Sequence, residues 1–233
     1  MPVDATSHRP LRIALVEDDD ALRDRVLVPG LRDYGFDVHA MRDAAALDAL
    51  MAETPVDIVV LDVGLPGEDG FAVTQRLRAV SGVGVVLLTG RGEVADRIRG
   101  LSEGADAYLA KPVVLGELAA TLHSLARRLR ASPTLTVAAD WRLDSDDWCL
   151  RSPKGASIAL SRPERDVLRQ LFATRGHQVP RETLIADLTD NAFDFDPHRL
   201  EMLIHRLRTK VLDGSGERLP LRAVRGAGYV MLP

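Results

Sequence analysis

The sequence predicts an α/β fold class with two domains, a five-stranded parallel-sheet domain followed by a winged helix-turn-helix domain. Three observations support this. The chain has 233 residues, more than one domain usually needs. Its first half alternates short apolar runs with amphipathic segments, the pattern of βα units around a parallel sheet. Its second half ends in helical segments followed by a hairpin-like pair of strands, an order typical of a winged helix-turn-helix.

The apolar runs of the first half are predicted strands, and the amphipathic segments are predicted helices. Runs such as 58–61 and 85–88 contain no polar residue, which suits strands that are covered on both faces of a sheet. The predicted strands are 11–16, 37–40, 58–62, 83–89 and 107–109, and the predicted helices are 21–34, 44–52, 71–79, 93–102 and 115–129.

The boundary between the domains is predicted at Ala131-Ser132-Pro133, because a proline disfavours helix at the residue before it. In the second half, Ser161-Arg162-Pro163-Glu164 is a capping box that opens a helix through about Ala173. The other segments predicted there are strands at 141–144, 148–151, 157–160, 221–224 and 229–232 and helices near 182–187 and 198–212. We expect a flexible N-terminus at 1–10, the first domain at 11–130, a linker at 131–133 and the second domain at 134–233.

The composition excludes several classes of protein. Hydrophobic residues make up 46% and charged residues 27%, ordinary values for a globular protein. No apolar run approaches the roughly 18 residues of a membrane span, and the N-terminus lacks a secretory apolar core. Cys149 is the only cysteine, so an intrachain disulfide is impossible, and no Cys/His cluster at zinc-ligand spacing occurs in the sequence. We expect a cytoplasmic protein.

Charge is unevenly spread along the chain. Residues 1–133 hold 15 Lys and Arg against 20 Asp and Glu, a net charge of −5, whereas residues 134–233 hold 15 against 14, a net charge of +1. The second domain is therefore not strongly basic. Any affinity for nucleic acid must come from local clusters of basic residues, and long-range attraction to DNA is modest.

Polar residues of the first domain stand where predicted strands end. Glu17 and Asp18 follow the first strand, Asp62 ends the third, Thr89 ends the fourth and Lys111 follows the fifth. Ligands of open parallel sheets bind outside the carboxyl ends of the strands. Three carboxylates meeting there repel one another, and a divalent cation relieves this; oxygen ligands of this kind favour Mg²⁺.

The remaining residues of this group suit a phosphoryl group. Lys111 offers a compact positive charge for a phosphoryl oxygen, Thr89 offers a hydroxyl, and Gly90 leaves room beside it. The group describes a carboxylate nucleophile, Asp62, that accepts a phosphoryl group. Each residue alone has a plainer explanation as a turn, cap or solvated residue. Their joint occurrence at four strand ends favours a site.

These residues, with the stretches 65–70 and 104–112, make the first domain resemble the flavodoxin-like receiver domain of bacterial two-component response regulators. The resemblance implies that Asp62 is the phosphoacceptor and that a histidine of a sensor kinase phosphorylates it. It also implies a cis Lys111–Pro112 peptide. The other implied roles are Mg²⁺ binding by Glu17 through water, by Asp18 and Asp62, and by the carbonyl of Gly64, phosphoryl contact by Lys111, and switching by Thr89 and Tyr108.

The predicted helix at 198–212 carries apolar residues at helical spacing and a polar band with Arg199, Arg206 and Lys210, as a recognition helix requires. Glycines at 226 and 228 allow a tight turn that would let Arg225 reach DNA. Taken alone, such a helix is more often a solvated surface helix. The basic residues that we predict to contact DNA are Arg199, Arg206, Arg208, Lys210, Arg222 and Arg225.

The stretches 160–164, 204–210 and 224–229 make the second domain resemble the effector domain of the OmpR/PhoB family. The resemblance implies that the 198–212 helix reads bases in promoter half-sites, that Arg225 serves the wing, and that the 189–197 loop can meet RNA polymerase. It also implies a homodimer formed by the 93–102 helix, the 107–109 strand and the 115–129 helix.

Two departures affect that dimer. Ala107 stands where the family usually has Asp, and Thr121 stands where it usually has Arg, so both partners of one charge pair are missing. Arg91, Asp96 and Glu117 of the dimer face remain. Surface ion pairs contribute roughly 0–1 kcal/mol each. We therefore expect a dimer that is weaker or differently arranged.

The sequence thus predicts a transcriptional regulator that is switched by phosphorylation of Asp62. The alternative is a DNA-binding regulator whose atypical receiver responds to protein contact or a ligand. An enzyme is not expected, because the second domain has no nucleophile–base pair, Gly-rich phosphate loop or metal cluster.

Overall fold

The computed structural model describes residues 9–80, 82–90, 104–130, 140–188, 197–224 and 226–233. The chain divides into two compact units, residues 1–134 and residues 135–233. The predicted helix at 93–102, the predicted linker at 131–133 and nearly all of the 189–197 loop lie outside the described residues.

The first unit is built on a five-stranded sheet in which all strands are parallel, as predicted. The strand order is β2-β1-β3-β4-β5, so the sheet is doubly wound from its centre. The third strand begins and ends where the sequence predicts. The strands are β1 (Arg12–Val16), β2 (Asp37–Met41), β3 (Ile58–Asp62), β4 (Gly84–Thr89) and β5 (Ala107–Ala110).

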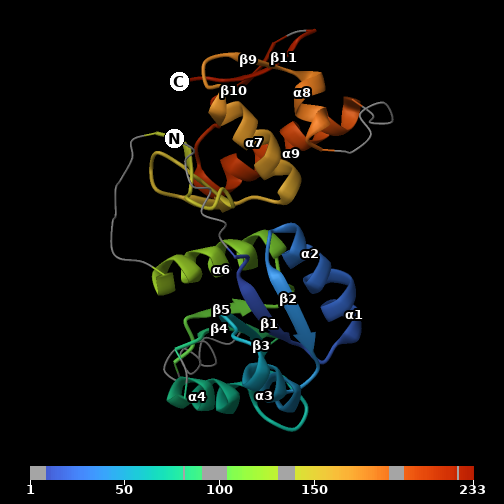
Figure 1. Cartoon of the computed structure of the whole chain (residues 1–233), viewed down its shortest axis with the longest axis vertical. Helices are drawn as coiled ribbons and strands as arrows, with labels where there is room; N and C mark the ends of the chain where they lie inside the picture. The colour runs from blue at the N-terminus through green and yellow to red at the C-terminus, as the bar shows by residue number, and fades with distance from the viewer. Residues whose placement is uncertain (1–8, 81, 91–103, 131–139, 189–196, 225) are drawn as a thin grey trace. The chain divides into compact units, whose positions relative to one another are not determined.

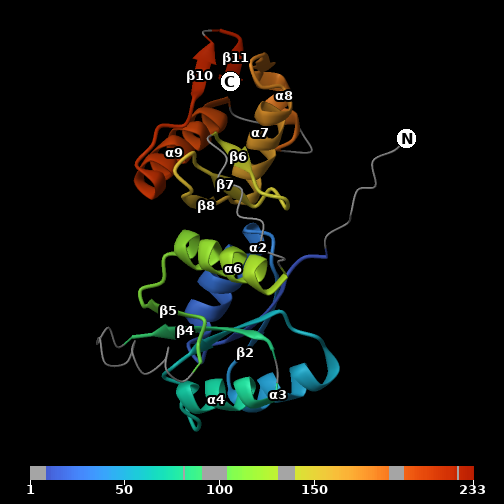
Figure 2. The same ribbon diagram turned by 90° about the vertical axis from the view of Figure 1, so that its left-hand side faces the viewer.

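Helices cover both faces of this sheet (Figures 1 and 2). The first helical segment and α6 (Leu115–Arg130) lie on one face, and α3 (Ala44–Glu53) and α4 (Gly70–Val80) lie on the other. Every residue of β3 and β4 is buried, because each side chain of these strands points into one of the two helix layers. The predicted continuous apolar runs thus form the centre of the sheet.

The first helical segment differs from the single α-helix predicted at 21–34. It consists of α1 (Asp20–Leu22), a π-helical stretch η1 (Arg23–Leu27) and α2 (Val28–Asp33). The N–H of Val28 donates to the carbonyl of Arg23, five residues earlier. Pro29 follows directly and has no N–H to donate, so the wider turn accommodates the proline without ending the helix.

In its described residues, the second unit combines two small antiparallel sheets with three helices (Figure 2). Apolar residues from all three helices and both sheets form one core. Its elements are β6 (Arg142–Leu143), β7 (Cys149–Arg151), β8 (Ser157–Ala159), α7 (Arg162–Ala173), β9 (Gln178–Pro180), α8 (Arg181–Ala186), α9 (Pro197–Ser215), β10 (Leu221–Val224) and β11 (Gly228–Met231). This is the predicted winged helix-turn-helix.

Two local features of this unit are a capping box, which the sequence predicts, and a short strand, which it does not. The predicted capping box is present: the backbone N–H of Ser161 donates to the Glu164 carboxylate over 2.8 Å. Strand β9, which pairs with β11, was not predicted. It has three residues, of which only Val179 is buried, so it is too short for a periodic signal.

Within the described residues, no helix combines the length and apolar character that a membrane span requires.

Candidate functional site

The register of the parallel sheet brings the predicted acidic residues together. Val16 of β1 pairs with Leu61 of β3, so Glu17 and Asp62, which directly follow these two residues in the chain, are neighbours. Carboxylate oxygens of Glu17, Asp18 and Asp62 all lie within 4.8 Å of one another. Glu17 is fully buried and Asp62 is 5% exposed, whereas Asp18 is half-buried. The site therefore has two buried carboxylates and one that is partly accessible to solvent.

Lys111 reaches the same point from the fifth strand. Its Nζ lies 2.8 Å from Asp62 Oδ2 and 2.8 Å from Glu17 Oε2. Its backbone N–H donates to the carbonyl of Thr89 over 2.7 Å, which fixes the chain just beyond β5. The Lys111–Pro112 peptide bond is cis, as the sequence predicts.

The charges of the site shift one another's protonation. Burial, reinforced by the nearby charge of Asp62, raises the pKa of Glu17 above its ordinary value. Burial opposes the charge of Lys111, but its hydrogen bonds to Asp62 and Glu17 outweigh that effect and raise its pKa. One ammonium group thus faces three carboxylates, so the site retains an unbalanced negative charge.

The donor set fits Mg²⁺. All three side chains are hard oxygen donors, which Mg²⁺ prefers, and the site is small. The Oε2 atom of Glu17 is buried and lies beside Lys111 Nζ, yet it accepts no aligned hydrogen bond from any described residue. Gly64 lies beside the site, and its N–H donates to Asp62 Oδ1 over 3.1 Å. Its carbonyl stays a predicted ligand.

Gly70 is a supporting residue that the sequence did not single out for this role. A Cβ at this position would lie 2.6 Å from the carbonyl oxygen of Asp62 and 2.8 Å from the Cα of Val63. These are backbone atoms that cannot move aside. Helix α4 therefore begins directly against the chain that presents Asp62, and only glycine fits there.

Arg23 is a second supporting residue that the sequence did not reveal. Its side chain is 9% exposed, and it donates to the carbonyl of Glu17 over 3.0 Å. It also pairs with Asp20 at 2.7 Å and with Asp24 at 2.8 Å. Asp19 caps the first helical segment by accepting from the N–H groups of Ala21 and Leu22, whereas Asp20 pairs with Arg23. Arg23 thereby ties the first helical segment to the acidic loop.

The two predicted switch residues occupy neighbouring strands. Thr89 ends β4 and is almost fully buried, and Tyr108 of β5 is half-buried against the apolar cluster beneath α3 and α4. A Cβ at Gly90 would meet open space, in agreement with the predicted room beside Thr89. Their switching roles stay predictions.

Part of the predicted dimer face can be located. Glu117 is exposed in the first turn of α6, whereas Arg91 and Asp96 lie outside the described residues. Next to Ala107, Asp106 is bound inside the unit: it pairs with Arg78 and accepts a hydrogen bond from the N–H of Val85 at 2.9 Å.

In the second unit, the predicted DNA-contacting residues divide into two groups. Arg199 and Arg206 are exposed on α9, and Arg222 is exposed on β10. Arg208 and Lys210 are half-buried, and both contact other residues of the unit. Arg208 donates to the carbonyl of Leu221 over 2.6 Å, and Lys210 lies 2.7 Å from the carboxylate of Glu164.

The hairpin β10–β11 uses its two glycines differently. Gly226 has a φ of +71°, the left-handed conformation that a tight turn needs. A Cβ at Gly228 would lie only 1.9 Å from the carbonyl oxygen of Val179, so this glycine allows β9 to pack against the hairpin. Arg225 lies outside the described residues.

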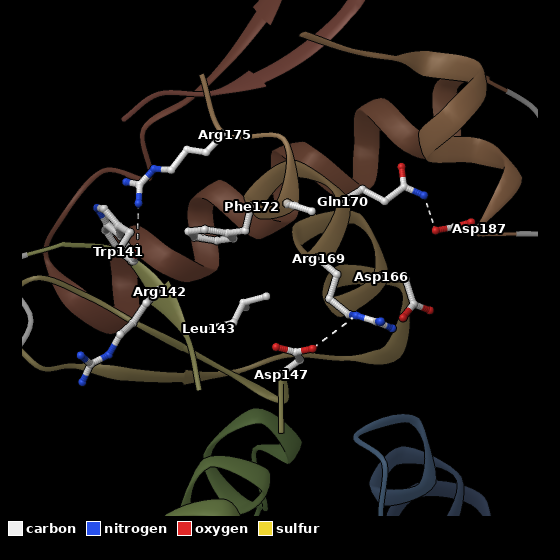
Figure 3. A pocket seen from close by; sticks show the side chains of 11 residues that line it. Trp141, Arg142, Leu143, Asp147, Asp166, Arg169, Gln170, Phe172, Arg175 and Asp187 are labelled. Carbon is white, nitrogen blue, oxygen red and sulfur yellow. Dashed lines mark hydrogen bonds and ion pairs between the residues drawn. The ribbon is translucent and has the colours of Figure 1, made fainter. Parts of the chain in front are cut away.

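A hollow of about 580 Å³ lies between β6 and α7 in the second unit (Figure 3). Trp141, Leu143 and Phe172 contribute its apolar lining. Two of its charged lining residues, Arg169 and Asp147, pair with each other at 3.3 Å.

Comparison with known proteins agrees with this architecture. The family model described as "Response regulator receiver domain" matches residues 13–123, and the one described as "Transcriptional regulatory protein, C terminal" matches residues 155–231. Transcriptional regulatory protein AruR of Pseudomonas aeruginosa is 34% identical over 94% of this chain and 95% of its own length. Transcriptional regulatory protein TctD of Salmonella typhimurium is 37% identical, over 95% and 97%.

Among solved structures, response regulator DrrB, an OmpR/PhoB homolog of Thermotoga maritima, is 23% identical with a TM-score of 0.47, and the match covers 97% of this chain and 100% of that one. The two curated relatives and the two family models together cover both units of the chain. The receiver domain implies a kinase partner, and the C-terminal domain implies DNA binding. The chain therefore belongs to the OmpR/PhoB family of two-component response regulators, a family of DNA-binding transcriptional regulators rather than enzymes.

Proposed function

We propose that a sensor histidine kinase phosphorylates Asp62 of this regulator and that the phosphoryl group controls DNA binding by the second domain. The observation that carries the proposal is the position of Lys111 Nζ, 2.8 Å from both Glu17 and Asp62 at the carboxyl end of the sheet. The contact with Lys111 holds the Asp62 carboxylate at the carboxyl end of the sheet, where ligands of open parallel sheets bind.

The chemistry follows from these contacts. The Asp62 carboxylate attacks phosphorus, an O–P bond forms, and the N–P bond of the phosphohistidine breaks with its electrons returning to the imidazole. Lys111 leaves its ion pair with Asp62 Oδ2 to neutralise a phosphoryl oxygen. A Mg²⁺ ion bound by Glu17, Asp18, Asp62 and the Gly64 carbonyl would neutralise the charge that builds up on the transferring group.

Thr89 and Tyr108 provide the route from the site to the surface. The hydroxyl of Thr89 turns toward the phosphoryl oxygens, and Tyr108 turns into the space that is vacated behind it. Thr89 lies on β4 and Tyr108 on the neighbouring edge strand β5, so their movement changes the face that the receiver presents for dimerisation. The missing partners at Ala107 and Thr121 make this dimer weaker or differently arranged.

The output is binding to promoter half-sites by α9 and the hairpin. Arg199 and Arg206 project from α9, and Arg222 and Arg225 serve the wing. Arg208 and Lys210 keep α9 in place through their contacts with Leu221 and Glu164. The 189–197 loop is available to RNA polymerase. Since its ligand is chromosomal DNA, the regulator works in the cytoplasm.

Phosphorylation with acetyl phosphate and Mg²⁺ tests the proposal. The wild type should acquire one base-labile, hydroxylamine-sensitive phosphoryl group, detected by mass spectrometry, and Asp62→Ala should acquire none. Asp57→Asn is the matched control, because Asp57 precedes the other end of the same strand and pairs with Arg9 at 3.0 Å. Equal labelling of Asp62→Ala, or no labelling of the wild type, would favour a receiver controlled by protein contact or a ligand instead.

A further inference from the structure

We propose that Met202 is a specificity-determining residue of this regulator and that its side chain contacts the C5-methyl group of a thymine in each DNA half-site. The inference rests on the proposed function, because it needs α9 to enter the major groove. It adds the chemical group that one exposed side chain recognises there.

Met202 lies on the face of α9 that points away from the core of its unit. The core face consists of Leu200, Ile204, Leu207 and Val211, all of them buried. At about 100° per residue, Met202 lies about 160° around the helix from Ile204. Its exposed fraction is 49%, so this methionine contributes little to the core.

Two contacts fix the rotation of α9 and therefore keep this face outward. Arg208 is bound to the carbonyl of Leu221 on β10, over 2.6 Å. Lys210 is bound to Glu164 at the start of α7, over 2.7 Å, and Glu164 is only 8% exposed. These tethers hold α9 to different elements and leave Met202 on the ridge between them.

Arg206 lies one turn further along the same ridge and is also exposed. An arginine beside a methionine offers a polar and an apolar contact to adjacent bases. The major groove presents hydrogen-bonding groups at every base pair but only one apolar group, the C5-methyl of thymine. A flexible thioether side chain adapts well to such a group, and the contact removes apolar surface from water on both sides.

The experiment replaces single thymines with deoxyuridine, which lacks the methyl group but keeps all hydrogen-bonding atoms. The probe is a duplex selected from a random-sequence library by the full-length protein, and affinity is measured by fluorescence anisotropy. For the wild type, we expect one thymine in each half-site at which the replacement weakens binding about fourfold, the effect of exposing one methyl group. Met202→Ala should bind the thymine and deoxyuridine duplexes equally well at that position.

Leu212→Ala is the matched control, because Leu212 is the other large apolar side chain that is exposed on the described part of α9. It should keep the wild-type pattern of deoxyuridine sensitivity. The inference is overturned if no thymine shows the effect, or if Met202→Ala keeps the effect at the same position. Arg206→Ala distinguishes failure of this inference from failure of the proposed function. If α9 binds DNA, Arg206→Ala should lose affinity even when Met202 contacts no thymine; if α9 does not bind DNA, Arg206→Ala should keep wild-type affinity.

Discussion

The carboxylate site of the receiver and the outer face of α9 both concentrate charge, but the surroundings of the charges differ. In the receiver, Lys111 lies 2.8 Å from two buried carboxylates, and each charge depends on its neighbours. On α9, Arg206 is exposed while Arg208 and Lys210 are bound to neighbouring elements. In the buried site the charged residues lie against one another, whereas basic residues of one exposed helix are either bound to neighbouring elements or exposed, where we propose that they bind DNA.

The largest effect is expected from Lys111→Met, which breaks the receiver side of this comparison. The variant should still acquire some phosphoryl group at Asp62, because the carboxylates proposed to bind Mg²⁺ remain. Its DNA affinity should no longer respond to phosphorylation, because nothing replaces the ammonium group at the phosphoryl oxygen. DNA affinity with and without acetyl phosphate measures this. The matched control is Lys154→Met on an exposed turn, and a normal response of Lys111→Met would refute the role.

Lys210→Met should mainly lower the free energy of unfolding. It therefore distinguishes a residue that holds α9 in place from a residue that contacts DNA. Removal of this lysine leaves the nearly buried Glu164 without its cation, and hydrogen bonds to charged groups contribute about 1.5–3 kcal/mol each. We expect a loss of that size in the free energy of unfolding, measured by urea denaturation. In a double-mutant cycle, Glu164→Gln should be strongly non-additive with it.

The salt dependence of DNA binding gives the second arm of that experiment. A lysine that contacts a phosphate contributes about 0.9 to the slope of the logarithm of affinity against the logarithm of salt concentration. The slope for Lys210→Met should equal that of the wild type. A slope reduced by about one would return Lys210 to the DNA-contacting residues.

Arg206→Ala should show the opposite pattern. Its side chain is exposed, so the free energy of unfolding should change little, while affinity for the selected duplex should fall by about 1–3 kcal/mol. Anisotropy titrations with selected and scrambled duplexes measure the loss. Arg142→Ala on β6 serves as the control for a lost positive charge elsewhere on the unit. Unchanged affinity for the selected duplex would remove Arg206 from the binding surface.

The smallest effect concerns the pH dependence of Mg²⁺ binding. Burial, with the charge of Asp62, raises the pKa of Glu17, so this carboxyl takes up a proton at a higher pH than an ordinary glutamate. Because the proton competes with the metal, Mg²⁺ affinity should fall as pH drops through that raised pKa. Calorimetric titrations at several pH values measure this. Glu17→Gln should bind Mg²⁺ more weakly and lose this pH dependence; if it retained the dependence, another group would be responsible.

Much of the receiver site could be predicted from the sequence because parallel βα units place the carboxyl ends of all strands at one edge. Once Asp62 and Lys111 are assigned to strand ends, their proximity follows from the topology. Arg23 and Gly70 could not be predicted in the same way. Arg23 matters because its side chain reaches back from the first helical segment to the carbonyl of Glu17, and Gly70 matters because α4 starts against the backbone of Asp62.

Helix α9, the proposed recognition helix, was less predictable, because the contacts of its charged residues also depend on tertiary packing. Its periodicity identifies the core face correctly, and it places Arg206 on the opposite side. The flanks of a helix are ambiguous, because a lysine or arginine there reaches either solvent or a neighbouring element. Lys210 meets Glu164 only because α7 begins beside the C-terminal part of α9, which depends on tertiary packing rather than on local sequence.

The most direct test measures DNA affinity of the wild type and Asp62→Asn, each with and without acetyl phosphate and Mg²⁺, on the same selected duplex. If phosphorylation of Asp62 controls the second domain, the treatment should tighten binding by the wild type about tenfold or more, equivalent to about 1.4 kcal/mol. Binding by Asp62→Asn should stay constant. An equal response of both proteins, or a fully labelled wild type with unchanged affinity, would contradict the account.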